Sequence, residues 1–149
     1  MIAYFDTSAV VPLLVVEIGS ARAITLWDGA DRVVSARLVY PEGRAALAQA
    51  HRLGRLTSRQ LRSAVNEFDS RYQQLDLVEV DDPLARHAGQ LAEAHGLRGY
   101  DAVHLAAAHR VRDADLVLVA GDQSLLTAAT ADGMSTAAIG VTAPPAGHR

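Results

Sequence analysis

Short apolar runs alternate with amphipathic stretches along the whole chain. Apolar residues fill positions 2–5 and 116–119, and weaker runs of strand character occupy residues 31–35, 75–80 and 137–141. Between these runs apolar residues recur at helical spacing, and we expect helices over residues 8–14, 21–27, 37–53, 57–74, 84–94, 102–110 and 123–131. Strands that alternate with helices favour an α/β fold with a mainly parallel sheet and right-handed crossovers.

Residues that typically cap helices stand ahead of several of these segments. They are Thr7 or Ser8, Ser35, Thr57 or Ser58, and Asp82 ahead of Pro83. The helices over residues 37–53 and 57–74 are separated by a short turn at Gly54. We therefore expect these two helices to form an antiparallel arm.

The length and composition of the chain limit its organisation. Its 149 residues correspond to about one domain, expected over residues 1–142, with residues 143–149 as a flexible tail. No run of about 18 apolar residues is present and no charged segment precedes an apolar stretch, so neither a membrane span nor a secretory signal is expected. The absence of cysteine excludes disulfides and thiolate metal sites, and makes a cytoplasmic location the default expectation.

Charge is distributed unevenly along the sequence. The formal net charge of -3 argues against a protein that coats nucleic acid through charge alone. All 14 basic residues are nevertheless arginine, and six of them lie in one window: Arg44, Arg52, Arg55, Arg59, Arg62 and Arg71. Arginine suits bidentate contact with phosphate, so this window either follows a phosphodiester backbone or is simply the solvated face of two helices.

Four carboxylates follow predicted strands or open predicted helices. Asp6 and Asp122 come after apolar strands, Asp101 opens a helix behind a glycine turn, and Glu42 lies near the start of another helix. Strand ends and the starts of the following helices share one edge of a parallel sheet, where ligands of open α/β sheets bind. Each acid alone has an ordinary explanation as a helix cap or a first-turn charge. Their recurrence on one edge predicts an acidic functional cluster.

The chemistry of such a cluster points to a metal ion. Carboxylates that lie close together repel one another, and their proton affinities rise unless a cation joins them. Hard oxygen ligands without cysteine or paired histidines favour Mg²⁺, with Mn²⁺ as a substitute, over Zn²⁺. An ion of this kind beside arginines is typical of phosphodiester chemistry, in which a water of lowered pKa attacks in line.

The residues around these acids resemble the motifs of a known family. The four segments are residues 6–9 (Asp-Thr-Ser-Ala), 40–47 (Tyr-Pro-Glu-Gly-Arg-Ala-Ala-Leu), 100–108 (Tyr-Asp-Ala-Val-His-Leu-Ala-Ala-Ala) and 121–126 (Gly-Asp-Gln-Ser-Leu-Leu). In order and spacing they resemble the four acidic motifs of PIN-domain ribonucleases, and in total length the small bacterial VapC-type toxins. The fourth segment departs from the family pattern, because relatives generally have Thr or Ser two residues before the last acid and this chain has Ala120.

The resemblance implies a fold, an activity and partners. It implies a three-layer α/β/α sandwich with a mainly parallel sheet of about four or five strands and a helical arm. It further implies a Mg²⁺-dependent endoribonuclease in which Asp6, Glu42, Asp101 and Asp122 are the catalytic and metal-binding residues. Relatives are usually homodimers that a separately encoded VapB-type antitoxin neutralises, and they cut structured RNA such as tRNA or rRNA within single-stranded loops.

Residues beside the acids allow more than one interpretation. Thr7 and Ser8 either hydrogen-bond the Asp6 carboxylate or only cap the helix that follows. His104 shares a helix face with Asp101, but a lone histidine is more often a packed side chain, so we leave it outside the catalytic set. Tyr100 either stacks on a base or packs beneath the site, and packing is the favoured expectation.

Two other functions compete with the nuclease hypothesis. The first is a PIN-like module that binds RNA or a partner without turnover, which Ala120 suggests. The second is a phosphotransfer enzyme with Asp6 as nucleophile, as in haloacid dehalogenase-type phosphatases. Those enzymes usually carry a second Asp two residues further on, where this chain has Ser8.

Overall fold

A computed structural model of the chain describes residues 1–140, and the expected tail at residues 143–149 lies outside the described residues. Five parallel strands form one sheet in the order β3-β2-β1-β4-β5. The strands are β1 (Ile2–Phe5), β2 (Arg32–Ala36), β3 (Asp76–Val78), β4 (Leu116–Ala120) and β5 (Ser135–Ala138). The α/β prediction with a parallel sheet is therefore confirmed, and β1 lies at the centre of the sheet.

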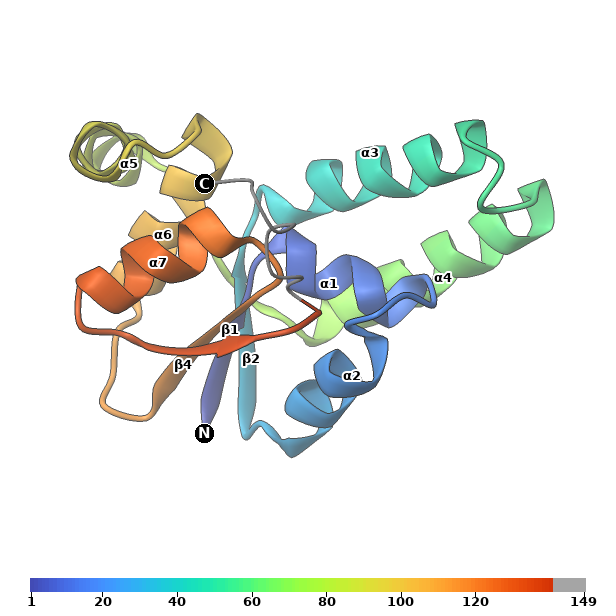
Figure 1. Cartoon of the computed structure of the whole chain (residues 1–149), viewed down its shortest axis with the longest axis horizontal. Helices are drawn as coiled ribbons and strands as arrows, with labels where there is room; N and C mark the ends of the chain where they lie inside the picture. Colours follow the sequence, from blue (N-terminus) through green and yellow to red (C-terminus); the bar gives the residue numbers. More distant parts are fainter. Residues whose placement is uncertain (141–149) are drawn as a thin grey trace, which may run out of the picture.

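Helices cover both faces of this sheet (Figure 1). They are α1 (Thr7–Leu14), α2 (Ser20–Gly29), α3 (Val39–Arg52), α4 (Ser58–Gln74), α5 (Asp82–His95), α6 (Gly99–Arg110) and α7 (Gln123–Ala131). In one hydrophobic core α5, α6 and α7 pack against one face of the sheet. In a second core the helices α1, α2, α3 and α4 pack against the other face. Alternate residues of β1 supply the two cores, since Tyr4 belongs to the first and Ala3 and Phe5 to the second.

The predicted arm is formed by α3 and α4, which extend together away from the sheet (Figure 1). Thr57 begins α4 with a capping box: its hydroxyl accepts from Gln60 N at 3.1 Å, and the Gln60 side chain accepts from Thr57 N at 2.8 Å. Where the two helices meet, a Cβ at Gly43 would lie 2.5 Å from two ring atoms of Phe68. The close packing of the arm at its base therefore requires glycine at this position.

Several local predictions are wrong. Ser35 does not cap a helix: it lies inside β2, and its hydroxyl donates to Phe5 O at 2.6 Å. The helix expected from residue 37 begins at Val39 instead, because Arg37 N continues the strand pairing by donating to Val78 O. Asp81 rather than Asp82 caps α5, accepting from Leu84 N at 3.0 Å. The last strand lies earlier than expected, over Ser135–Ala138.

Among the described residues 1–140, no helix is long and apolar enough to cross a membrane.

Candidate carboxylate active site

The fold places all four carboxylates at the carboxyl edge of the sheet. Asp6 directly follows β1, and Asp122 follows the neighbouring strand β4 after one glycine. Glu42 lies in the first turn of α3 and Asp101 in the first turn of α6, and both helices begin at the same edge. Asp6 and Asp122 also cap α1 and α7, since they accept from Ala9 N at 3.1 Å and Leu125 N at 3.0 Å. Capping and membership of the cluster are thus compatible.

Asp6 is a buried carboxylate held by a local hydrogen-bond network. It is only 3% exposed, and the Ser8 hydroxyl lies 2.7 Å and 2.8 Å from its two oxygens. The same hydroxyl accepts from Gly121 N at 2.8 Å, which ties the loop after β1 to the loop after β4. Burial raises the pKa of Asp6 from 3.8 to about 6, although the charge of His104 and the Ser8 bond act in the opposite direction.

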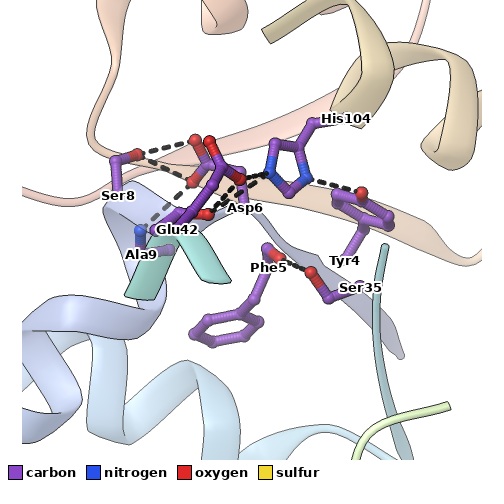
Figure 2. Close-up of polar contacts among 9 residues, drawn as sticks. Tyr4, Phe5, Asp6, Ser8, Ala9, Ser35, Glu42 and His104 are labelled. Carbon is purple, nitrogen blue, oxygen red and sulfur yellow. Dashed lines mark hydrogen bonds and ion pairs between the residues drawn. The ribbon is translucent and has the colours of Figure 1, made fainter. Parts of the chain in front are cut away.

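Glu42 is oriented by a chain of buried side chains (Figure 2). Its Oε1 atom accepts from the Thr7 hydroxyl at 2.7 Å and lies 2.7 Å from His104 Nε2. The other ring nitrogen of His104 lies 2.8 Å from the hydroxyl of Tyr4, a fully buried residue of β1. A carboxylate only accepts hydrogen bonds, so Nε2 carries the hydrogen and donates it to Glu42.

These bonds settle the ionisation of Glu42. Partial burial by itself raises the pKa of this group, but the hydrogen bond and charge of His104, with the Thr7 bond, leave the pKa below its ordinary value. Glu42 is therefore ionised at neutral pH, and both hydrogen bonds fall on the same oxygen.

Arg98 connects the remaining two carboxylates. Its Nε lies 3.4 Å from Asp101 Oδ2 and its Nη2 lies 3.6 Å from Asp122 Oδ2. The Arg98 side chain is 80% exposed, whereas Asp101 is buried. Burial, with the nearby charge of Asp122, raises the pKa of Asp101 despite the partial compensation from Arg98. The contacts are long, so we regard Arg98 as a loosely held cation rather than a fixed member of the cluster.

The donor set suits a hard divalent cation, although the side chains are not arranged around one. Within residues 1–140, no three His, Cys, Asp or Glu side chains are grouped so as to enclose a metal ion. The reason is visible in the contacts: Glu42 turns toward His104, and Arg98 approaches both Asp101 and Asp122. Burial is the largest cause of the raised pKa values of Asp6 and Asp101, and the nearby charge of Asp122 adds to both. Carboxylate oxygens are the type of ligand that Mg²⁺ and Mn²⁺ prefer in proteins.

The surroundings of two residues beside the acids, His104 and Tyr100, differ from those predicted from the sequence. His104 is 1% exposed and contacts Glu42, so it belongs to the cluster rather than to an ordinary core. The sequence indicates this position only through its spacing, since the alanine-rich helix that carries Asp101 buries His104 on the same face.

The packing expected of Tyr100 is wrong, because this residue is 62% exposed. Ala120 is fully buried in the core beneath α6 and α7.

Three of the six arginines in the window make side-chain contacts within the chain. Arg55 pairs with Glu17, Arg71 pairs with Glu67, and Arg44 donates to the Tyr40 hydroxyl at 2.8 Å. These contacts favour the interpretation of the window as a solvated helical face. Arg98, which lies outside the window, is the arginine that contacts the acids at the candidate site.

Comparison with known proteins places this arrangement in a family. The PIN domain model matches residues 3–130. Ribonuclease VapC49 from Mycobacterium tuberculosis (strain ATCC 25618 / H37Rv) is 48% identical over 134 residues, which covers 90% of this chain and 93% of the relative. The structure of M. tuberculosis VapC20, described as a sarcin-ricin loop cleaving toxin, has 18% identity and a TM-score of 0.63 over 95% of this chain and 99% of that chain. A toxin-antitoxin complex from Klebsiella pneumoniae has 18% identity and a TM-score of 0.58 over 80% of this chain and 86% of that chain. The family match spans most of the sheet and all four carboxylates, and the chain belongs to the PIN-domain family.

Proposed function

We propose that the protein is a metal-dependent endoribonuclease and acts as the toxin of a VapBC-type pair. The observation that carries the proposal is the buried acidic cluster at the end of β1, where Asp6 and Asp101 have raised pKa values beside Asp122. Perturbed pKa values of this kind are concentrated at functional sites, and a bound cation would offset the cost of burying the charged carboxylates. The 48% identity to a protein named as a ribonuclease supports RNA as the substrate.

The residues have separable roles in this proposal. Asp6, Asp101 and Glu42 would hold Mg²⁺ or Mn²⁺, and Asp122 would assist directly or through water. A bound ion of this kind supplies a water of lowered pKa and stabilises negative charge on the phosphoryl oxygens. Ser8 keeps the Asp6 carboxylate fixed, since it bonds both oxygens, and His104 fixes Glu42 by binding one of its oxygens. Because these bonds already fix the two carboxylates, less conformational entropy would be lost when the metal ion binds.

Arg98 has a different role, because it is exposed and loosely held. In the free protein it partly neutralises Asp101 and Asp122. With the acids neutralised by a bound cation, the Arg98 guanidinium would be free to contact a phosphate of the RNA backbone. We propose that Arg98 alternates between these two anionic partners.

The partners of the protein follow from the same assignment. We propose an RNA substrate cut in single-stranded loops of structured RNA, a separately encoded VapB-type antitoxin and a homodimeric state. A toxin-antitoxin complex among the proteins of the same fold supports the antitoxin, and the loop-cleaving VapC20 supports an RNA loop as target. A loop also suits a recessed acidic cluster, because an unpaired backbone can bend toward it.

The test compares wild type with Asp6→Asn on a mixed pool of cellular RNA. Both proteins are purified free of any bound inhibitor and assayed with Mg²⁺ or Mn²⁺, and again after chelation. Asp28→Asn is the matched control, because it makes the same change at an exposed residue of α2 outside the cluster. Discrete fragments from wild type and the control, which need the metal and are absent with Asp6→Asn, are expected.

Two results would contradict the proposal. Cleavage that survives both chelation and Asp6→Asn would place the activity elsewhere. RNA binding without any metal-dependent product, from folded wild type on several RNAs, would instead indicate a PIN-like binding module without turnover.

A further inference from the structure

An apolar hollow of about 870 Å³ lies between the starts of α3 and α6, the end of α4 and the residues that follow β3. Its walls include Tyr40, Pro41, Tyr72, Val80, Tyr100 and Val103. Two of these residues are the immediate chain neighbours of proposed metal ligands, because Pro41 precedes Glu42 and Tyr100 precedes Asp101. The hollow therefore adjoins two of the proposed metal ligands along the chain, although none of the four carboxylates lines it.

The aromatic rings that line the hollow differ in the contacts that they make with the rest of the chain. Tyr40 is stacked on Phe68 with ring centroids 5.1 Å apart, and its hydroxyl donates to Asp69 at 2.7 Å. Tyr72 contacts Tyr40 and accepts a hydrogen bond from Arg37 at 2.9 Å. Both therefore have structural partners within the arm or at its base.

Tyr100 has no such partner. It is 62% exposed, and within residues 1–140 its side chain makes no hydrogen bond and no contact with another aromatic ring. Most of the apolar area of the ring stays in water, so the folded chain gains little from an aromatic residue here. A flat, free ring next to an acidic cluster that handles phosphodiesters has the form of a stacking platform.

Positive charge accompanies this ring. Arg98 lies two residues before Tyr100, is 80% exposed and contacts the acids only at 3.4 Å and 3.6 Å. Arg37 also lines the hollow, where it is paired with Glu79 and its guanidinium lies 5.9 Å from the Tyr72 ring centroid. Sites for single-stranded nucleic acid combine aromatic platforms for bases with arginines along the backbone.

We propose that Tyr100 and the hollow form a base-binding subsite, in which an unpaired nucleobase next to the scissile phosphate stacks on the Tyr100 ring. This inference rests on the proposed nuclease function and names how its substrate is held. Adjacent Cα atoms lie about 3.8 Å apart, so a ring at Tyr100 and a carboxylate at Asp101 can engage neighbouring parts of one nucleotide. The subsite selects single strands, because a paired base cannot leave its stack without a cost.

A second copy of the chain is a weaker occupant for this surface. A stable interface buries about 800 Å² on each partner. Among the described residues, the large apolar side chains exposed at the hollow are Tyr100 and Val80, at 62% and 42%. This is little apolar surface for an interface of that size, whereas one ring suffices for one base.

The test measures the binding of short RNA in the presence of a chelator, so that cleavage does not interfere. The probes are single-stranded RNA octamers with 2-aminopurine at successive positions, read by anisotropy and by the fluorescence quenching that stacking causes. Tyr100→Phe keeps the ring and is expected to match wild type. Tyr100→Leu keeps apolar volume without the ring, and is expected to bind about 10-fold more weakly or worse and to lose the quenching. Leu53→Ala, which changes an exposed apolar residue after α3, is the control and is expected to match wild type.

Three results would overturn the subsite. They are unchanged affinity and quenching with Tyr100→Leu, equal binding of single-stranded and fully paired RNA, and failure of wild type to bind the octamers. Sedimentation of the RNA-free variants identifies the alternative, because conversion of a dimer to a monomer by Tyr100→Leu with unchanged RNA affinity would assign the surface to a second copy. Failure of the proposed nuclease function would give a different result. Quenching that depends on Tyr100, without metal-dependent cleavage, would refute the nuclease function but support the base-binding subsite.

Discussion

The burial of Asp6 predicts that the proposed metal-binding cluster costs stability when no cation is present. Asp6→Asn replaces the carboxylate with a neutral group of nearly the same shape. A pKa raised from 3.8 to about 6 corresponds to about 3 kcal/mol, at about 1.36 kcal/mol for each pKa unit. We expect the variant to be more stable than wild type at pH 7 by up to about 3 kcal/mol, less whatever the Ser8 bond to the charged group contributes.

The sign of the pH dependence follows from the direction of the shift. The folded state of wild type holds the Asp6 proton more tightly than the unfolded state, so this group contributes most stability below pH 3.8. That contribution is lost as the pH rises through about 6. The asparagine side chain does not titrate, so the stability difference between the two proteins should grow from near zero at about pH 4 to its full value at about pH 7.

Urea unfolding between pH 4 and pH 8 with a chelator present measures this difference, with Asp28→Asn as the control that should show no comparable trend. Addition of Mg²⁺ should then stabilise wild type but not Asp6→Asn, by about 2.7 kcal/mol at a concentration of 100 times the dissociation constant. A variant that is less stable than wild type at pH 7, or a difference that does not change with pH, would refute the reasoning.

Three further substitutions test other parts of the structure. Tyr4→Phe removes the hydroxyl that bonds His104, and should lower the free energy of unfolding by about 1–2 kcal/mol in urea titrations; a neutral effect would contradict the buried chain of bonds. Gly43→Ala places a methyl group against a buried ring and should lower the melting temperature, whereas Gly89→Ala, with nothing within 4 Å, should not. Arg98→Ala removes the cation that competes for the acids, so Mn²⁺ should bind more tightly in calorimetric titrations and RNA more weakly; weaker Mn²⁺ binding would contradict this role.

The order of elements was predictable because it depends on local pattern. The apolar runs at β1 and β4 are buried on both faces, which is what a central parallel strand requires, and both were evident in the sequence. The helix α7 was predicted at its full extent, because Asp122 caps its start and Asp132-Gly133 ends it. The gathering of the four carboxylates on one edge followed from the same parallel topology, while their catalytic role stays a prediction.

What the sequence did not specify depends on contacts between distant segments. Ser35 has the composition of a helix cap, yet its hydroxyl finds Phe5 O on the neighbouring strand, and only the sheet register decides between the two. His104 meets Tyr4 across 100 positions of the chain, so no local pattern could reveal that bond. The exposure of Tyr100 likewise reflects the absence of a neighbour in the described structure, which local sequence does not show.

The double variant Asp6→Asn/Asp101→Asn tests the central claim most directly. It removes the two buried carboxylates whose pKa values are raised and leaves Glu42 with its bonds to His104 and Thr7. The measurement is the rate of RNA cleavage at a series of Mg²⁺ concentrations, with circular dichroism to establish that the variant is folded. We predict that wild type cleaves in a Mg²⁺-dependent manner and that the folded double variant does not cleave at any Mg²⁺ concentration. Cleavage by the folded double variant at the wild-type rate would contradict the assignment of this cluster as the active site.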